Sequence, residues 1–230
     1  MEQLSPLSEE NEDHFSLELL FDPKLFDLAK PKLENFQKLM AYYRCAMMEI
    51  ETKFNVLNEE FSLRFDRNPI SDIRTRLKSP RSMKEKLDRK QLPFTLSSIE
   101  ENLCDVAGVR IICGFVADVY DLCDALLKQD DIKLLEIKDY IRDPKPNGYR
   151  SLHLIVTVPI FLAKEKRRMK VEIQLRTIAM DSWASLEHQL YYKKDFSFTE
   201  EMKQDLQHCA ALSAELDQKM DALRRCIHEK

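Results

Sequence analysis

The residues from Tyr140 to His153 read YIRDPKPNGYRSLH. Two prolines restrict the backbone of this stretch, and its Asn-Gly pair is typical of a turn because both residues tolerate positive φ. The flanking segments, 132–141 and 150–158, are rich in β-branched and apolar residues and predict two strands. A rigid loop with three basic side chains and two tyrosines therefore separates two strands. Most loops only connect elements, but these side chains together favour a nucleotide-phosphate site.

The composition is typical of a globular protein in a reducing compartment. The chain has 230 residues, of which 44% are hydrophobic, enough for one large domain with helical additions. Its net charge of −4 gives no overall attraction to nucleic acid or membranes. The six cysteines show no metal-ligand spacing and are expected to be small buried side chains. No signal peptide or membrane span is recognisable in the sequence, so we expect a cytoplasmic protein.

Charged residues are distributed unevenly along the chain. Met1–Asp22 carries seven acidic residues and no Lys or Arg, and we expect it to be loosely ordered apart from one short helix at 17–21. Residues 74–90 carry eight basic residues against two acidic ones. The remaining chain, 23–230, is expected to form one domain.

Long helices are predicted on both sides of the strand-forming region. Apolar residues recur every three or four positions from Leu33 to Phe61, which predicts a helix at about 31–66 with Pro31 in its first turn. A second such series, from Met202 to Ile227, predicts a helix at about 199–228. Packing within one subunit is the favoured explanation of both series, and a subunit interface is the alternative.

Between these helices the sequence predicts alternating strands and helices. The strands are expected at 73–78, 105–115, 132–141, 150–158 and 170–177. The helices are expected at 81–90, 97–103, 119–128 and 178–192, with Ser97 or Ser98 as a cap and a charged turn at 164–170. The fold class is therefore α+β or α/β, with a mixed sheet of about five strands surrounded by helices.

Only three glycines are present, and the usual phosphate cradles (Walker A, GxGxxG and the kinase Gly-rich loop) do not occur in the sequence. Phosphates would therefore have to be held by side chains and a metal. Arg74, Arg76 and Lys78 share one face of a predicted strand, and Arg81 and Lys86 lie on the helix that follows. Such side chains neutralise phosphate oxygens. A solvated basic surface is the alternative, and it suits the helix better than the strand.

Two acidic residues, Asp105 and Glu172, begin or interrupt segments that are otherwise apolar. Buried acids need a cation or a metal. Two carboxylates on adjacent strands form an oxygen site suited to Mg²⁺, and one of them could accept a proton from an attacking hydroxyl. Structural salt bridges to Arg110 and Arg176 explain the same spacing equally well.

Four segments together resemble the synthetase motifs of the RelA/SpoT family. They are RLKSPRSMKEKL (76–87), DVAGVRIIC (105–113), YIRDPKPNGYRSLH (140–153) and VEIQLRTIAMDSWASLEHQLYYK (171–193). The resemblance covers about 74–193, the catalytic core of a synthetase domain, whereas the terminal helices match in layout only. The short length resembles the small alarmone synthetases, especially the RelP-type branch. Ser182, where relatives often have an aromatic residue, departs from the pattern outside the chemistry.

The resemblance implies a nucleotidyltransferase-like fold and the transfer of pyrophosphate from ATP to the 3′-hydroxyl of GDP or GTP. The products would be ppGpp or pppGpp, the alarmones of the stringent response. It further implies that Asp105 binds Mg²⁺ and that Glu172, at the same metal, acts as the base. The implied ATP-binding residues are Arg76, Lys78, Lys86 and Arg110, and the implied GDP- or GTP-binding residues are Lys145, Asn147, Tyr149, His153 and Gln174.

The resemblance implies a homotetramer built through the terminal helices. A non-catalytic module that binds a nucleotide or single-stranded RNA, with Tyr149 stacking on a base, is the alternative function. Two metal-binding acids favour the enzyme, because a binding module has no need of them.

Overall fold

The computed structural model describes residues 23–65, 67–191 and 198–228. The strands are β1 (Ile70–Leu77), β2 (Ala107–Cys113), β3 (Lys133–Asp139), β4 (Leu152–Phe161) and β5 (Lys166–Thr177). The helices are α1 (Pro23–Phe65), α2 (Pro80–Arg89), α3 (Leu96–Asn102), α4 (Val116–Leu127), α5 (Ile178–Tyr191) and α6 (Glu200–His228). The expected short helix at 17–21 lies outside the described residues.

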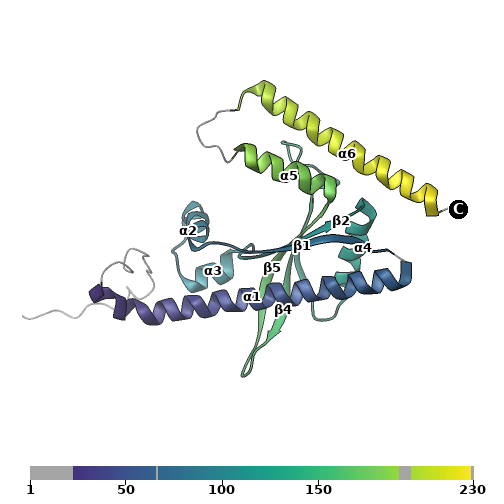
Figure 1. Ribbon diagram of the computed structural model, residues 1–230. Coiled ribbons are helices and arrows are strands. Elements are labelled where there is room, and N and C mark those ends of the chain that lie inside the picture. The colour runs from purple at the N-terminus through teal and green to yellow at the C-terminus, as the bar shows by residue number, and fades with distance from the viewer. Residues whose placement is uncertain (1–22, 66, 192–197, 229–230) are drawn as a thin grey trace, which may run out of the picture.

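The strands form one mixed sheet in the order β1-β2-β5-β4-β3. Only the β2–β5 pair is parallel, and the other neighbours run antiparallel. Figure 1 shows α1 running across the sheet, with α5 and α6 stacked as a pair at one end of the strands. This arrangement confirms the predicted α+β class with a five-stranded mixed sheet and long terminal helices.

One face of the sheet is apolar and the other is polar, as β5 illustrates. Val171, Ile173 and Leu175 are fully buried in the core, whereas Glu172 and Gln174 between them are half-buried. Successive side chains of a strand point to opposite faces. The apolar face packs against α1, which contacts four of the five strands, and the opposite face is left for polar side chains.

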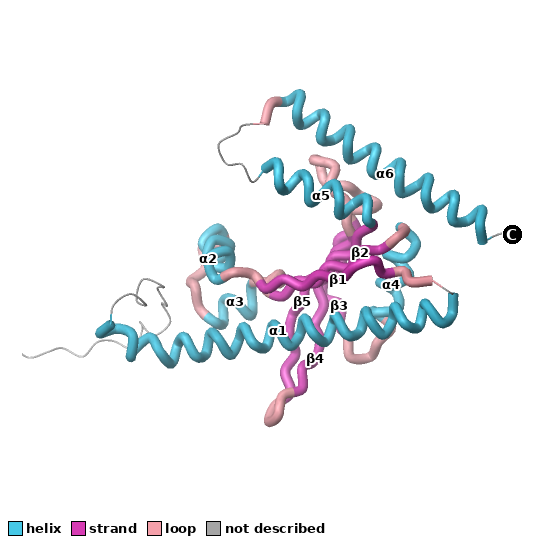
Figure 2. The backbone as a smooth tube through the Cα atoms, in the orientation of Figure 1, coloured by secondary structure: helices cyan, strands magenta, loops and turns pink. Residues whose placement is uncertain are grey.

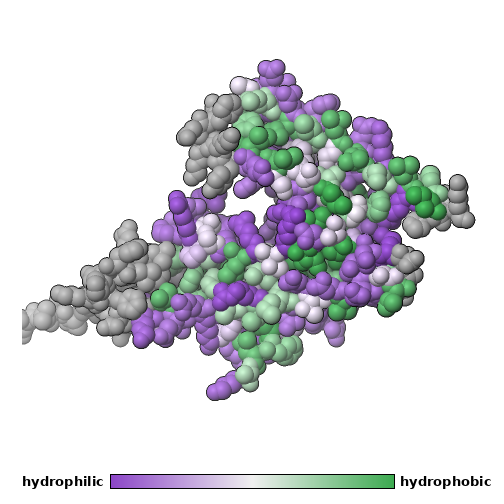
Figure 3. Space-filling view, viewed as in Figure 1, coloured by the Kyte–Doolittle hydropathy of each residue, from purple (hydrophilic) through white to green (hydrophobic). Residues whose placement is uncertain are grey.

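The two apolar series on the terminal helices differ in burial. In α1 the series packs into the core of the subunit, where Tyr43, Ile50 and Phe54 are almost fully buried. In α6 the series lies largely on the surface, with Leu216 52% and Leu223 58% exposed. Figure 3 shows hydrophobic side chains gathered over α5 and α6. The favoured explanation, packing within one subunit, is therefore confirmed for α1 and wrong for most of the α6 series in the described chain.

Two predictions for the starts of helices are wrong. α1 begins at Pro23, so Pro31 lies inside the helix instead of in its first turn. The apolar series predicts only the part of the helix from Leu33 to Phe61, and the helix begins before it. The cap of α3 is Thr95, whose hydroxyl accepts a hydrogen bond from the Ser98 backbone N–H at 3.1 Å, rather than Ser97 or Ser98.

Three further expectations also need correction. β5 begins at Lys166, so the predicted charged turn at 164–170 is mostly strand; Figure 2 shows the β4–β5 hairpin projecting past α1. Asp105 precedes β2 instead of lying within it. Of the cysteines, Cys113 and Cys123 are buried as expected, but Cys209 and Cys226 are exposed on α6.

Among the described residues, no helix combines the length and apolar character needed to cross a bilayer.

Candidate active site

A pocket of about 640 Å³ opens on the polar face of the sheet. It is lined by residues of β1, β2 and β5 and of the loops after β1 and before β2: Arg74, Thr75, Arg76, Lys78, Asp105, Gly108, Val109, Arg110, Glu172 and Gln174. Its volume lies within the range of small-molecule and cofactor sites. The pocket brings together both predicted carboxylates and most of the predicted ATP-binding residues.

Strand register explains why residues far apart in the sequence meet here. In the antiparallel β1–β2 pair, Arg74 lies opposite Arg110 and Arg76 opposite Gly108. In the parallel β2–β5 pair, Gly108 lies beside Glu172 and Arg110 beside Gln174. The cationic residues of β1 and β2 therefore lie next to the acidic and amide side chains of β5.

Asp105 is held by two lysines. Its Oδ2 accepts a hydrogen bond from Lys78 Nζ at 2.9 Å and forms an ion pair with Lys86 Nζ at 2.8 Å. Its Oδ1 is buried and has no hydrogen-bond partner among the described residues. Burial raises the pKa of Asp105, but the two lysine ammonium groups outweigh it, so this pKa lies below its ordinary value. Asp105 is thus an anion with one free oxygen, and its predicted alternative pairing with Arg110 is wrong.

Glu172 has a defined partner at each carboxylate oxygen. Oε1 lies 3.3 Å from His153 Nδ1, and Oε2 accepts a hydrogen bond from Gln174 Nε2 at 3.1 Å. Burial raises the pKa of Glu172, and the Asp105 charge adds to this, but the hydrogen bonds from His153 and Gln174 bring the pKa below its ordinary value. The carboxylate is therefore ionised at neutral pH and can accept a proton. Its predicted alternative partner, Arg176, is bound elsewhere.

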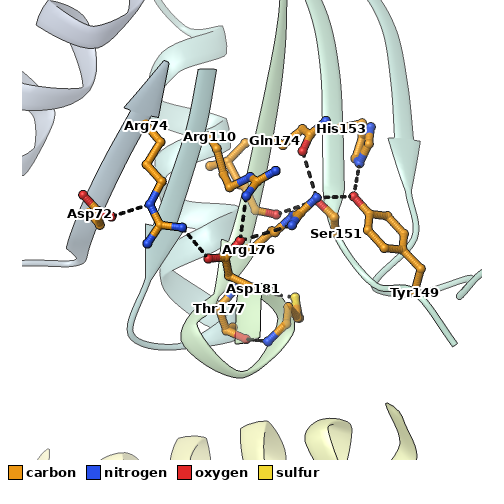
Figure 4. A network of polar contacts seen from close by, with 12 residues as sticks. Asp72, Arg74, Arg110, Tyr149, Ser151, His153, Gln174, Arg176, Thr177 and Asp181 are labelled. Carbon is orange, nitrogen blue, oxygen red and sulfur yellow. Dashed lines mark hydrogen bonds and ion pairs between the residues drawn. The ribbon is translucent and has the colours of Figure 1, made fainter. Parts of the chain in front are cut away.

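Asp181, in the first turn of α5, collects three arginines (Figure 4). Its Oδ2 accepts from Arg74 at 3.0 Å, and its Oδ1 accepts from Arg110 and from Arg176, each at 3.1 Å. Burial and the neighbouring Arg176 lower the pKa of Arg110, and Asp181 counteracts them. A single buried carboxylate thus holds two of the three arginines that line the pocket from β1 and β2, Arg74 and Arg110.

Arg176 continues this network toward the 140–153 loop. One of its nitrogens donates to the Tyr149 hydroxyl at 2.7 Å and to Gln174 Oε1 at 2.9 Å. The Tyr149 hydroxyl lies 2.8 Å from His153 Nε2 (Figure 4). Because Arg176 donates to the tyrosine oxygen, the tyrosine can donate to Nε2, and His153 Nδ1–H can then donate to Glu172. The chain of hydrogen bonds ends on the carboxylate that is predicted to be the base.

The predicted acceptor residues are only partly brought together. His153 and Gln174 contact Glu172 directly, and Lys145 Nζ lies over the Tyr149 ring at 4.8 Å from its centroid. Asn147 differs: its Nδ2 donates to Glu187 Oε1 on α5 at 3.0 Å, and its Oδ1 accepts from the Tyr149 backbone N–H. Asn147 therefore shapes the loop, and the structure does not bring it to the pocket.

Asp181 had no predicted role, and Arg176 was predicted only as a possible salt-bridge partner. The alternation of 170–177 contains a signal for Arg176, because it places this residue on the same face as Glu172. Asp181 has no such signal, since its partners come from three different strands.

Of the two carboxylates, Asp105 offers a free oxygen that suits part of a magnesium coordination shell, whereas both oxygens of Glu172 already have protein partners. No cluster of three or more His, Cys, Asp or Glu side chains able to hold a metal occurs in the described part of the chain. Mg²⁺ is commonly bound by one or two carboxylates, with waters and substrate phosphates as its other ligands. The free, buried Oδ1 of Asp105 suits this arrangement.

Comparison with known proteins gives concordant results. Residues 75–197 match the family model described as the region found in RelA / SpoT proteins. The chain is 40% identical over 199 residues to GTP pyrophosphokinase YwaC of Bacillus subtilis, covering 86% of this chain and 95% of that protein. It is 34% identical over 196 residues to GTP pyrophosphokinase YjbM of the same organism, covering 85% and 92%.

Solved structures agree with these relatives. The crystal structure of small alarmone synthetase 2 from Bacillus subtilis superposes with a TM-score of 0.74 at 40% identity, covering 81% of this chain and 97% of that one. Small alarmone synthetase 1 from the same organism, bound to its product pppGpp, superposes with a TM-score of 0.75 at 34% identity, covering 83% and 97%.

Proposed function

This chain belongs to the RelA/SpoT family, and we propose that it is a GTP pyrophosphokinase that transfers the pyrophosphate of ATP to the 3′-hydroxyl of GDP or GTP. The products are the alarmones ppGpp and pppGpp, and AMP leaves. The observation that carries this proposal is Glu172, an ionised carboxylate held at both oxygens beside a cationic pocket. The names of the two Bacillus subtilis relatives support it.

ATP is assigned to the β1–β2 side of the pocket. Arg76 is exposed and forms no ion pair with another described residue, so its guanidinium is available for a ligand. Lys78, Lys86 and Arg110 complete the proposed donor site. Phosphoryl-type transfer depends mainly on positioning and on stabilising charge at the phosphates, and these cations can supply both.

Asp105, with Glu172, is the proposed Mg²⁺ site. A bound ion would neutralise charge on the ATP phosphates. The lysines on Asp105 Oδ2 keep the carboxylate ionised and oriented, and its Oδ1 stays available.

The acceptor nucleotide is assigned to the other side of Glu172. Tyr149 is half-buried, and its ring is proposed to stack on guanine, with Lys145 beside it. His153 and Gln174 orient Glu172, which accepts the proton of the 3′-hydroxyl as that oxygen attacks the β-phosphorus of ATP. Asn147 contributes through the loop conformation.

The direct test is to incubate the protein with labelled ATP, GDP or GTP, and Mg²⁺, and to separate the nucleotides by chromatography. We expect a guanosine nucleotide that carries the label at its 3′ position, together with AMP. Wild-type protein that binds both nucleotides but forms neither product would refute the enzyme and favour a binding module.

Replacing Asp105 with Asn is expected to raise the Mg²⁺ concentration needed for half-maximal synthesis. One hard anionic ligand is lost, and we expect a shift of about tenfold or more, since even outer partners of metal ligands contribute that much. A matched control is Asp88→Asn, which alters only an exposed ion pair to Lys84 on α2. An unchanged Mg²⁺ titration of Asp105→Asn would assign Asp105 a purely structural role.

We also propose that residues 23–230 form one synthetase domain, with its catalytic core at 74–193, and that the protein is a cytoplasmic homotetramer. The exposed apolar face of α6 supports an interface there. Beside it lies a groove of about 680 Å³ between α5 and α6, whose lining includes Ile178, Leu216 and Met220. The α1 series is already buried within the subunit, so any contribution of α1 to the interface must come from its other face.

A double substitution, Leu216→Glu with Leu223→Glu, is expected to dissociate the tetramer. Both side chains are about half exposed in the single subunit, so the subunit should fold while charges enter the interface. Light scattering should report smaller particles, and Lys219→Ala, on the same helix, should leave their size unchanged. If the double variant unfolds, the series belongs to the subunit core.

A further inference from the structure

Helix α6 contacts the loop that presents Tyr149, defined here as the acceptor loop, Pro144–Arg150. The contacts come from Gln207, Ala210 and Asp217. Their spacing puts all three residues on one face of the helix. That face is turned to the loop, whereas the apolar series of α6 lies largely on the surface.

The contact at Asp217 is a buried ion pair. Arg150 donates to Asp217 Oδ2 at 2.8 Å, and the two side chains are only 11% and 4% exposed. Removing one member of such a pair leaves a buried charge without its partner. Arg150 directly follows Tyr149, so the pair fixes the backbone from which the Tyr149 ring projects.

The contact at Ala210 leaves no space for a side chain. Gly148 has a φ of +88°, and a Cβ built on it would overlap with the Ala210 Cβ. Glycine is therefore required here both for the backbone conformation and for the close approach of the loop to the helix.

The contact at Gln207 is a hydrogen bond to the loop backbone. Gln207 Nε2 donates to the Pro146 carbonyl oxygen at 2.7 Å. Residues 142–147 are exposed, so few other groups hold this part of the loop. One that does is Glu187 on α5, which accepts from Asn147.

We propose that α6 positions the acceptor loop, so that affinity for the guanosine nucleotide depends on Gln207 and Asp217, neither of which lines the catalytic pocket. This inference rests on the proposed acceptor role of the loop. Gln207 and Asp217 are positioning residues, and their substitution should weaken binding of the guanosine nucleotide while binding of ATP stays unchanged.

Gln207→Ala is the first test, because Gln207 is exposed and its loss does not endanger folding. We expect the KM for GDP to rise about threefold to tenfold, the ratio for one lost hydrogen bond, with an unchanged KM for ATP. Asp217→Asn keeps the shape but removes the charge, and should raise the KM for GDP about tenfold to a hundredfold. Should Asp217→Asn fail to fold, Gln207→Ala carries the test.

Arg224→Gln is the matched control. Arg224 lies on the same helix and pairs with the buried Asp118 of α4 at 2.9 Å, away from the acceptor loop. Its loss should lower the melting temperature while the KM for GDP stays the same. An increase in this KM as large as that of Gln207→Ala would show that any loosening of α6 has the same effect, and would overturn the specific role of Gln207 and Asp217.

Trp183 gives a second readout that needs no catalysis. It is the single tryptophan of the chain, its Nε1 donates to the Leu206 carbonyl oxygen on α6, and it packs against Ala210 and Tyr149. We expect acrylamide to quench its fluorescence more strongly in Gln207→Ala and Asp217→Asn than in wild type or Arg224→Gln.

The KM for GDP and the quenching of Trp183 together distinguish the positioning role of α6 from the acceptor role of the loop. Stronger quenching with an unchanged KM for GDP would show that α6 holds the loop but that the loop does not bind the acceptor, which overturns the premise. Unchanged quenching with an unchanged KM for GDP would overturn the positioning role of α6. Equal increases in the KM for GDP and the KM for ATP would show that α6 does not act specifically on acceptor binding, and would overturn the proposal.

Discussion

Glu172→Gln is expected to abolish alarmone synthesis while leaving the binding of ATP and GDP nearly unchanged. The amide has the shape of the carboxylate, and its oxygen can still accept a hydrogen bond from one of the two donors, Gln174 or His153, so the site should largely keep its form. It cannot accept the proton of the attacking hydroxyl. Loss of a general base costs about 10²–10⁴-fold in rate, and the loss grows if the metal is also released.

The measurement is single-turnover synthesis with saturating nucleotides, combined with separate titrations of ATP and GDP. Glu165→Gln is a suitable control, because Glu165 lies at the tip of the β4–β5 hairpin and accepts from Tyr42, outside the pocket. Near-normal turnover of Glu172→Gln would exclude Glu172 as the base. Lost turnover together with lost ATP binding would instead assign Glu172 to the metal alone.

The placement of Glu172 on the polar face could be predicted from the sequence. Residues 170–177 alternate, and the structure confirms that Val171, Ile173 and Leu175 are buried while Glu172 lies opposite them. Alternation is a local property of an extended backbone, so one strand suffices to establish it. The cationic face of β1 is predictable for the same reason.

The pairing of the charges could not be predicted, because it depends on register between strands and on a helix. Arg110 and Arg176 were both plausible partners for the two site carboxylates, yet both bind Asp181. The site acids are held by Lys78, Lys86 and His153 instead. Asp181 can bind three arginines only because α5 begins directly after β5, at the end of the sheet where the side chains of these arginines meet (Figure 4).

The two apolar series show a second feature that the sequence alone does not predict. Their spacing is similar, yet that of α1 lies in the core and that of α6 is largely exposed. Periodicity reveals that a helix has an apolar face, but it does not say what covers that face. Local sequence likewise predicts the turn at Asn147-Gly148. It does not predict which distant residues the turn contacts, here Glu187 and Ala210.

Tyr149→Ala is expected to weaken binding of GDP or GTP about tenfold to a hundredfold, because stacking contributes roughly 1–3 kcal/mol per base. ATP affinity should hardly change, since the donor is assigned to β1, α2 and Arg110. Some loss of stability should accompany the substitution, because the half-buried ring packs against Trp183 and Ala210. Separate titrations of ATP and GDP, with a thermal melt, measure these effects. Equal weakening of both nucleotides would contradict the guanine-stacking role.

Tyr149→Phe separates the ring from its hydroxyl. Stacking alone predicts a small effect, because the aromatic face remains and GDP affinity should stay close to that of the wild type. The structure adds a role for the hydroxyl, which accepts from Arg176 and contacts His153 Nε2, and His153 in turn contacts Glu172. Without it, His153 loses the partner that fixes its tautomer and its orientation toward the base.

We therefore expect Tyr149→Phe to lower kcat about threefold to tenfold, the effect of one lost hydrogen bond, with little change in the KM for GDP. Tyr149→Ala should change both constants. Steady-state kinetics of the two variants, with GDP varied at saturating ATP, distinguish binding by the ring from positioning by the hydroxyl. A Phe variant with wild-type kcat would show that the hydrogen-bond chain from Arg176 to Glu172 does not contribute to turnover, and the role of Tyr149 would then be stacking alone.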